Sequence, residues 1–537
     1  MSQAHSVAHI LRERVTLTVE SIDRLYLNVY VPKLQRVLGV VGFFREQRGA
    51  SFASSALMGP LTTAFVKALE RFAQTEGVPL LTFKPGQRKD EVAQAHLATF
   101  QGEEGVLFIG KAQEKATVWR TERRHDATTG QPYAWLVKST ALVNQYYLYA
   151  VDRDFGPFFL KFCSYFPYNA KLCLNGHEYL KRQLHKEGIA CEALDNGLLS
   201  CADPKRMQDI CDALDAPCID ALLRKWLARL PHPFTPQERE AGFRYDISIL
   251  QAEFALTQVL DRPVNGRILF EEVIRENLDL GRPSQVQLIF GPRVPKTTQR
   301  HYRFRTRVIT QGVVPALYVD YKHARIKQYH KEGRALRTET TINDTRDFTI
   351  GKRLHNLPAV RAVGFAANRR LLDVQQLSHD CLIGEDAFAQ VTRPQVVKGQ
   401  RVAALPFADP RVQALLSVVV LYCLLPRGFA NKDLRAHLAP LLGIDPSQFC
   451  AGRMTYDLRR LRLHGLIERI PHTQRYRPTP AGLRTALFFT RVYARLLRPG
   501  LAHLAPLAPP GSDGLRPYFD KLEGALDRYI ADAQRAA

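Results

Sequence analysis

Residues 452–469 have the sequence GRMTYDLRRLRLHGLIER, and the spacing of their apolar side chains predicts a helix that ends at Gly465. Glycine readily adopts the left-handed backbone conformation that follows a helix. The apolar residues that share one face are Met454, Leu458, Leu461 and, as a further candidate, Leu463. The residues on the remaining faces include Arg453, Arg459, Arg460 and Arg462. The stretch therefore predicts an amphipathic helix with a basic outer surface.

The segments on either side extend this prediction to a small module. Residues 412–425 and 432–442 have the composition of two helices, the first of them apolar throughout. Residues 466–470 and 475–478 predict two short strands joined by a turn, and a further helix follows. The predicted order is three helices, a β hairpin and a last helix.

Residues 456–469 resemble the junction between recognition helix and wing in winged-helix regulators, and residues 475–482 resemble the strand that closes the wing. The resemblance covers residues 411–490 and implies a fold that places one helix in the major groove of duplex DNA. The DNA-binding residues that it implies are Arg453, Arg459, Arg460, Arg462, Arg469, Arg475 and Arg477. The alternative is a winged helix that serves only as a protein-contact module.

The charge of the chain favours a polyanionic partner. Lys and Arg number 75 against 52 Asp and Glu, which gives a net charge of +23. Residues 411–500 alone hold 15 basic residues and four acidic ones. Such a surplus attracts nucleic acid and releases its counterions. The alternative is an arginine-rich composition that implies no partner.

The sequence also predicts a cytoplasmic protein without a membrane partner. The N-terminal residues lack the long apolar run of a signal peptide, and residues 412–425 are too short to span a bilayer. The nine cysteines form no CxxC pair and no zinc-finger spacing, so we expect free thiols in a reducing compartment.

Upstream, the chain predicts a multidomain protein of α/β and α+β type. Residues 38–44, 78–83 and 106–110 are short apolar runs expected as buried strands, and residues 64–76 have a helical pattern. Residues 121–132 are polar and predict an exposed turn or hairpin tip.

Further along, residues 189–230 predict a small helical subdomain, and Thr235 with Glu238 predicts a capping box that begins a long helix. Antiparallel strands are expected from their period of two at residues 285–290, 302–310, 316–322, 326–331 and 335–343, and helix returns at 355–390. The predicted divisions are an α/β domain (1–132), an aromatic and basic segment (133–233), an α+β domain with an antiparallel sheet (234–400), the winged helix (401–498), and a linker with a terminal helix (499–537).

Polar residues alternate along the central strands. Lys327, Tyr329 and Lys331 share one face of their strand, Arg337 and Glu339 share a face of the next, and the preceding strand offers Asp320. Carboxylates bind Mg²⁺, cations neutralise phosphate and a tyrosine can attack phosphorus. The alternative is a solvated face with cross-strand ion pairs.

The spacing Tyr329-His330-Lys331 … Leu336-Arg337-Thr338-Glu339 resembles a Tyr-x-Lys … Leu-Arg-x-Glu pattern of rolling-circle replication initiators. The resemblance implies metal-dependent nicking of one DNA strand. The sequence departs from that family at His330, where an acid is expected, and it has no His-hydrophobic-His motif. The site residues are then Tyr329 as nucleophile, Glu339 and Asp320 as ligands of Mg²⁺ or Mn²⁺, and Lys327, Lys331 and Arg337 as cations.

Two other segments are candidates for binding. Asp152 and Asp154 follow an aromatic strand and are an alternative metal pair. Residues 161–182 interleave aromatic and basic side chains, which suits stacking on unpaired bases, although such aromatic side chains more often fill a core. No phosphate-binding glycine motif occurs, so we expect no nucleotide or organic cofactor.

Together these patterns predict a DNA-binding protein that binds duplex DNA through the winged helix and single-stranded DNA through the central sheet. Nicking in replication initiation or by a mobile element is the leading hypothesis. The alternatives are a non-catalytic regulator or structural DNA-binding protein, and an RNA-binding protein.

Overall fold

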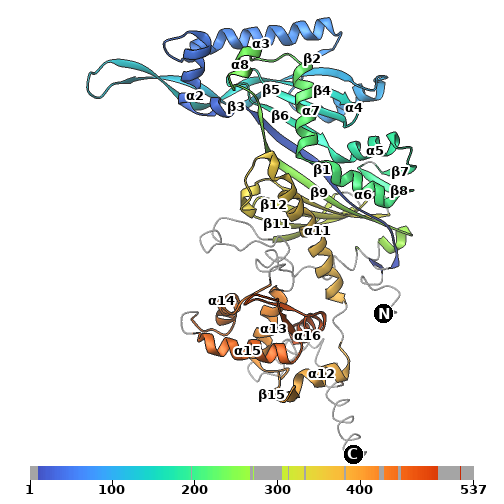
Figure 1. Ribbon diagram of the computed structural model, residues 1–537. Helices are drawn as coiled ribbons and strands as arrows, with labels where there is room; N and C mark the ends of the chain where they lie inside the picture. Colours follow the sequence, from blue (N-terminus) through green and yellow to red (C-terminus); the bar gives the residue numbers. More distant parts are fainter. Residues whose placement is uncertain are drawn as a thin grey trace, which may run out of the picture. The chain divides into compact units, whose positions relative to one another are not determined.

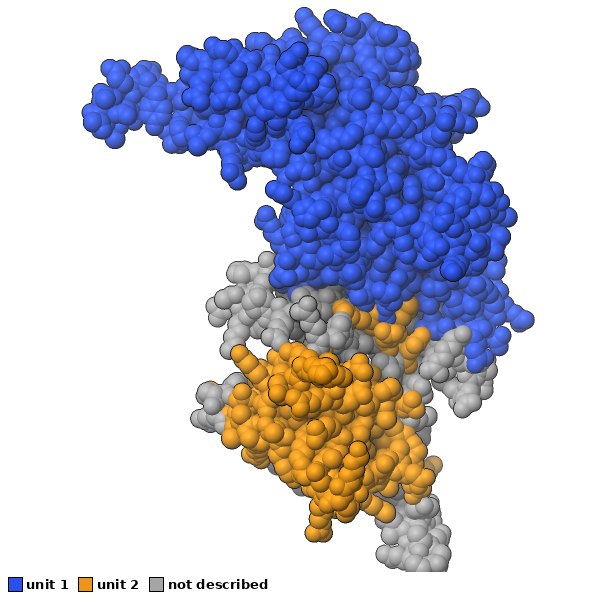
Figure 2. Space-filling model, viewed as in Figure 1, with its two compact units in different colours: residues 1–5, 9–286, 292–369 blue, residues 6–8, 287–291, 370–537 orange. Residues whose placement is uncertain are grey.

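The computed structural model describes residues 10–11, 13–194, 196–266, 270, 305–311, 314–331, 334–379, 383–422, 428–445, 449–493 and 521. They fall into two compact units (Figure 2). Within the described residues, unit 1 extends to Arg369 and unit 2 begins at Arg370. The predicted strand at 285–290 and the predicted linker and helix at 499–537 lie outside the described residues, apart from residue 521.

Unit 1 is built on one large sheet (Figure 1). Its described strands follow the order β10-β11-β12-β13-β9-β1-β6-β5-β4-β3-β2, and neighbours are antiparallel except for the parallel pair β2 and β3. The strands are β1 (Val15–Tyr30), β2 (Leu80–Thr82), β3 (Gly105–His125), β4 (Pro132–Asp152), β5 (Gly156–Cys163), β6 (Ala170–Asn175), β9 (Asp246–Leu260), β10 (Arg305–Gln311), β11 (Val314–Tyr321), β12 (Ala324–Lys331) and β13 (Ala335–Ile342). A separate small hairpin joins β7 (Cys191–Leu194) to β8 (Gly197–Cys201).

The described helices of unit 1 connect these strands. They are α2 (Val37–Gly42), α3 (Ser55–Thr75), α4 (Lys89–Thr99), α5 (Gly176–Lys186), α6 (Pro204–Ala213), α7 (Ala216–Arg229), α8 (Pro236–Glu240) and α11 (Leu357–His379), with short 3-10 turns at Pro32–Gln35, Thr345–Phe348 and Leu354–Asn356. Helix α11 begins in unit 1 and continues past Arg369.

One face of the sheet is apolar and is covered by helices. Strand alternation places Phe254, Phe158 and Phe162 on this face, because the register links them through β1 and β6. Their ring partners come from three helices: Phe365 of α11 at 5.5 Å, Trp226 of α7 at 5.0 Å and Phe65 of α3 at 5.9 Å. Burial of each such side chain contributes about 1.5–3 kcal/mol to the hydrophobic driving force. The apolar face is therefore the main core of unit 1.

The opposite face of the same sheet is polar. Residues one step along the strands point to it, among them Arg24 of β1, Lys171 of β6 and Lys161 of β5. Helix α4 covers part of this face, where Lys89 lies 4.2 Å from the ring centre of Tyr147. The predicted catalytic residues of β11, β12 and β13 lie on this polar face.

The N-terminal prediction is partly wrong. Residues 38–44, expected as a strand, lie in α2 and in the π-helical turn Phe43–Gln47, which buries Phe43 and Phe44. A short apolar run does not distinguish a buried strand from a buried helix by periodicity alone. The capping box of Thr235 and Glu238 is confirmed, but the helix that it begins, α8, has only five residues. The strands predicted within 316–343 are confirmed as β11, β12 and β13.

The predicted divisions at residues 132 and 233 do not separate compact units. Strands β3 and β4 pair on both sides of residue 132, from Gly105 with Val151 to His125 with Pro132. Strand β9, which follows residue 233, pairs with β1 along most of its length. The sheet therefore joins the first three predicted segments, because pairing between distant strands leaves no signal in local composition.

Unit 2 has an order of elements close to the one predicted. Its described elements are α12 (Glu385–Thr392), β14 (Gln395–Val397), β15 (Gln400–Val402), α13 (Pro410–Tyr422), α14 (Asn431–Leu441), α15 (Ala451–Leu463), β16 (Ile467–Arg469), β17 (Tyr476–Pro478) and α16 (Pro480–Val492). Phe429 forms an antiparallel bridge with Tyr476, which adds a third chain segment beside the hairpin. The predicted inward residues Met454, Leu458 and Leu461 are buried in one core with residues of α13, α14 and α16.

The seven described cysteines are free thiols. Among the helices of the described residues, none combines the length and apolar character needed to cross a membrane.

Candidate functional site

The predicted catalytic residues of β12 and β13 lie together on the polar face of the sheet. Register pairs Lys327 with Glu339 and Tyr329 with Arg337, so these four side chains occupy adjacent positions. The Tyr329 hydroxyl donates a hydrogen bond to Glu339 Oε1 at 2.8 Å, and Lys327 Nζ lies 4.4 Å from the centre of the Tyr329 ring. Lys331 lies further along β12, opposite Ala335.

Burial changes the pKa values of Tyr329 and Glu339. It raises the pKa of Tyr329 well above the usual range, and the charge of Glu339 adds to that effect. Burial also raises the pKa of Glu339, although Arg337 Nε lies 2.5 Å from Oε1 and opposes the increase. The phenol therefore remains protonated at neutral pH, and Glu339 is the acceptor of its hydrogen bond.

Arg337 is the centre of a buried ionic cluster. Its side chain has no exposed surface, and its Nη2 donates to Asp23 Oδ2 at 2.8 Å. His177 Nε2 lies 2.8 Å from the same Nη2 and 3.1 Å from Asp23 Oδ1. The cluster connects β13, the N-terminal strand β1 and the first turn of α5.

The pKa values of the cluster follow from its charges. Burial opposes ionisation of Asp23, but the hydrogen bond of His177 and the charge of Arg337 outweigh it and lower the pKa of Asp23 to about 2. Burial lowers the pKa of His177. At neutral pH the cluster is therefore an ion pair between Asp23 and Arg337 beside an uncharged imidazole. Sequence reasoning missed Asp23 and His177, since no local pattern connects residues 314 positions apart.

The structure changes the role expected for Arg337 and Asp320. Arg337 was expected as a cation on an open face, but its guanidinium is buried and occupied by Asp23 and Glu339. Asp320 is buried as well and accepts a hydrogen bond from Arg325 Nε at 2.7 Å. It stands opposite Arg325, whereas Glu339 stands opposite Lys327. Each carboxylate thus has its own arginine, and β12 lies between the two strands that carry them, while binding of Mg²⁺ or Mn²⁺ by this pair stays a prediction.

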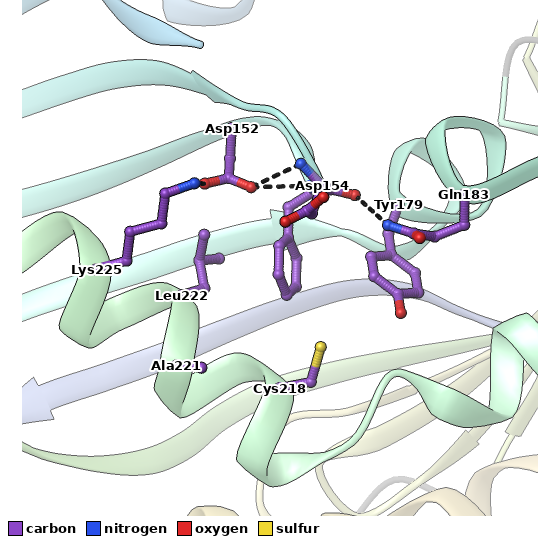
Figure 3. A pocket seen from close by; sticks show the side chains of 9 residues that line it. Asp152, Asp154, Tyr179, Gln183, Cys218, Ala221, Leu222 and Lys225 are labelled. Atoms are coloured by element: carbon purple, nitrogen blue, oxygen red, sulfur yellow. Dashed lines mark hydrogen bonds and ion pairs between the residues drawn. The ribbon is translucent and has the colours of Figure 1, made fainter. Parts of the chain in front are cut away.

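Asp152 and Asp154 line a pocket of about 540 Å³ between α5, α7 and the turn after β4 (Figure 3). Asp152 is buried, and its oxygens accept bonds from the backbone N–H groups of Asp154 and Phe155 and from Lys225 and Trp226. Asp154 pairs with Lys186. A carboxylate with four donors has little capacity left for a metal, so Asp152 fixes the turn and the position of α7. Among the described residues, no group of three or more His, Cys, Asp and Glu is placed to hold a metal ion.

The predicted DNA-binding arginines of unit 2 divide into two groups. An exposed group, on α15 and the β16–β17 hairpin, consists of Arg453, Arg459, Arg462, Arg469 and Arg477. Arg460 is buried instead: it pairs with Asp457 at 3.6 Å and donates to the carbonyl of Ala404. Arg475 is partly buried and donates to Asp433 and to the carbonyl of Gly428. The expectation that Arg460 is an exposed arginine of the helix is therefore wrong, whereas DNA contact by the partly exposed Arg475 stays a prediction.

The β14–β15 hairpin adds a basic element that the sequence reasoning did not identify. His464 of the α15 C-cap holds it through the carbonyl of Ala403, at 2.9 Å from Nε2. Its two-residue turn, Lys398 and Gly399, has positive φ at both positions, which matches the right-handed twist of a tight hairpin. Lys398 and Arg401 are exposed there, and Gln400 accepts a hydrogen bond from Arg459. The alternation VV-KG-QRV was the available signal.

In comparisons with known proteins, no family model, no curated protein and no solved structure matched the chain.

Proposed function

We propose that the protein binds DNA and that unit 2 is a winged-helix module for duplex DNA. The order α13, α14, α15, β16, β17 and the bridge of Phe429 with Tyr476 support this proposal, because a winged helix has three helices and a small antiparallel sheet. In such a fold α15 is the helix placed in the major groove, and the β16–β17 hairpin is the wing.

The distribution of exposed arginine carries the proposal. Arg453, Arg459 and Arg462 are exposed on α15, and Arg469 and Arg477 are exposed on the hairpin. The buried Asp457 holds Arg411 at 2.5 Å and Arg460. The acid of α15 therefore neutralises inward arginines and leaves the outward ones available for phosphates and base edges.

Salt dependence tests the proposal. If four to six of these cations contact phosphate, the affinity of the full chain for a random duplex should fall with a log–log slope of about −4 to −5. The measurement is fluorescence anisotropy with labelled duplex across a salt series, with an RNA duplex of the same sequence as competitor. Affinity that does not depend on salt would contradict the proposal, and preference for the RNA would favour RNA as the partner.

A second candidate function is cleavage of a DNA strand by Tyr329. The hydrogen bond from its hydroxyl to Glu339 favours this candidate, since it supplies a carboxylate in position to take the phenolic proton. In that reaction the Tyr329 oxygen bonds to phosphorus and the phenolic proton moves to Glu339. The bond from phosphorus to the departing DNA oxygen breaks, and that oxygen leaves with the electron pair and takes a proton from water to become a hydroxyl.

Substitution of the pair tests this candidate. Tyr329→Phe should abolish a covalent protein–DNA adduct, and Glu339→Gln should abolish cleavage, while both variants keep the duplex affinity of unit 2 within a few-fold. Tyr318→Phe is the control, because Tyr318 lies opposite Lys327 on the next strand. Labelled single strands and duplexes, with and without Mg²⁺ or Mn²⁺, give the readout. A wild-type protein that forms neither product nor adduct would leave DNA binding alone as the function.

A further inference from the structure

Strands β3 and β4 continue past the sheet as a two-stranded arm. Strand β5 pairs with β4 only over Gln145–Asp152, and β2 pairs with β3 only over Ile109–Lys111. Residues 113–144, here called the β3–β4 arm, pair only with each other in the described sheet, from Gln113 with Asn144 to His125 with Pro132. At the usual rise of a strand the arm is about 40 Å long. It projects beyond α2 in Figure 1.

The part of the arm between the sheet and the tip is fixed to the rest of unit 1. The indole N–H of Trp119 donates to the carbonyl of Leu34 at 3.1 Å, and the N–H of Ser55 at the start of α3 donates to Thr121 Oγ1 at 2.8 Å. Trp119 and Leu136 are buried against this support. An isolated hairpin is only marginally stable in water, so these contacts give the remaining part a firm base.

The distal tip, residues 122–135, has an ordered turn. Asp126 Oδ1 accepts hydrogen bonds from the backbone N–H groups of Thr128 and Thr129, at 2.9 and 2.8 Å. Gly130 has a φ of +67°, a conformation that glycine adopts without strain. The turn thus holds the two strands in register to their ends.

One face of the tip combines aromatic and cationic side chains. Tyr133 and Trp135 lie edge to face with ring centres 6.3 Å apart, and the Arg124 guanidinium lies 5.3 Å from the Trp135 ring. Glu122 pairs with Arg120 at 2.9 Å and with Arg124 at 3.6 Å. Tyr133 is 43% exposed. Two large aromatic side chains at the end of an arm have no core to fill, which indicates a surface that another molecule covers.

We propose that the tip of the β3–β4 arm binds single-stranded DNA, with Tyr133 and Trp135 stacking on unpaired bases and with Arg120 and Arg124, which share their face of the hairpin, near the phosphates. Aromatic rings flanked by arginine provide the stacking and charge that unpaired nucleotides require, without selecting a sequence. This inference rests on the proposed DNA-binding function and adds a second contact, in unit 1, to the duplex site of unit 2. The protein would then prefer DNA in which duplex and single strand meet.

A duplex with a single-stranded extension tests the inference in the full-length protein. Each stacked base contributes about 1–3 kcal/mol, so wild type should bind a duplex with an unpaired oligothymidine extension about 10-fold or more tightly than the blunt duplex. The double variant Tyr133→Ala/Trp135→Ala should lose this preference and keep its affinity for the blunt duplex. Leu142→Ala is the control, because Leu142 is a 63% exposed apolar residue of the same arm.

Tryptophan emission gives a second readout. Trp119 and Trp226 are buried, so quenching of emission by oligothymidine should come from Trp135 and should disappear in Trp135→Phe while affinity remains. A wild-type protein that binds both DNAs equally, or a double variant that keeps the preference, would overturn the inference and leave duplex binding intact. A protein that binds neither DNA would overturn the proposed function itself. If the substitutions at the tip do not affect DNA binding but abolish self-association or binding of another protein, the tip is the site of a protein partner.

Discussion

Replacement of Arg337 with Ala should lower the free energy of unfolding by about 3–5 kcal/mol, because it leaves Asp23 buried without its cation. The side chain of Arg337 is fully buried, and it holds Asp23 and Glu339 from two different strands. Urea denaturation followed by circular dichroism measures the change. If the Ala variant does not fold, Arg337→Lys is measured in its place. Lysine keeps the charge but lacks the planar guanidinium, so this variant should retain part of the stability.

The control for Arg337 is an exposed ion pair. Arg206 forms two hydrogen bonds with Glu187 at the surface, at 2.7 and 2.8 Å, and Arg206→Ala should lower the free energy of unfolding far less than Arg337→Ala. Equal small losses for Arg206→Ala and Arg337→Ala would contradict the view that the buried cluster holds β1 to β13.

The cluster also makes the free energy of unfolding depend on pH, in a direction that follows from the pKa values. The folded-state pKa of Asp23 is depressed, so its contribution to stability is present above the unfolded pKa near 3.8 and is lost as pH falls toward about 2. The pKa of His177 is lowered as well, so stability falls as pH drops below the unfolded value of 6.5. The difference between wild type and Arg337→Ala should therefore shrink in acid, where Asp23 becomes neutral.

The double variant Arg459→Ala/Arg462→Ala should weaken duplex binding by about 30-fold or more while the melting temperature changes little. Each arginine that contacts DNA contributes about 1–3 kcal/mol, and exposed helix residues contribute little to folding. Both side chains are exposed on α15. Anisotropy titration at one fixed salt concentration measures the affinity, and differential scanning calorimetry measures the melting temperature.

Two controls separate DNA contact from charge and from folding. Lys67→Ala/Arg71→Ala removes two exposed charges from α3 and should leave affinity nearly unchanged. Arg460→Ala should instead lower the melting temperature, since Arg460 is buried against Asp457 and Ala404. Unchanged affinity in the Arg459/Arg462 variant would show that α15 is not the helix that contacts DNA.

Local patterns predicted much of the structure. Alternation placed Lys327 with Tyr329 and Arg337 with Glu339 on one face of their respective strands, and helical spacing placed Met454 and Leu458 in a core, because both signals depend only on neighbours in the chain.

Partners that come from distant segments were not predictable in this way. The ionic cluster needs Asp23 beside Arg337, and the burial of Arg460 needs Ala404 from the segment after the β14–β15 hairpin. In each case the charged residue looked available because a partner that buries it, the Asp23 carboxylate or the Ala404 carbonyl, is remote in sequence. The prediction of a strand at residues 38–44 was wrong for another reason, since a short apolar run suits a buried helix as well as a strand.

The position of β1 has a consequence for how the chain assembles. This strand lies between β6 and β9, so its two neighbours are made about 145 and 230 residues after it, and contacts of such sequence separation fold slowly. During synthesis β1 has no strand partner until residues 170–175 emerge, and its second edge remains open until residues 246–260 follow. An unpaired strand edge can associate with other chains. We therefore expect fragments that end before residue 246 to aggregate, and fragments that begin after residue 30 to lack the strand that unites both halves of the sheet.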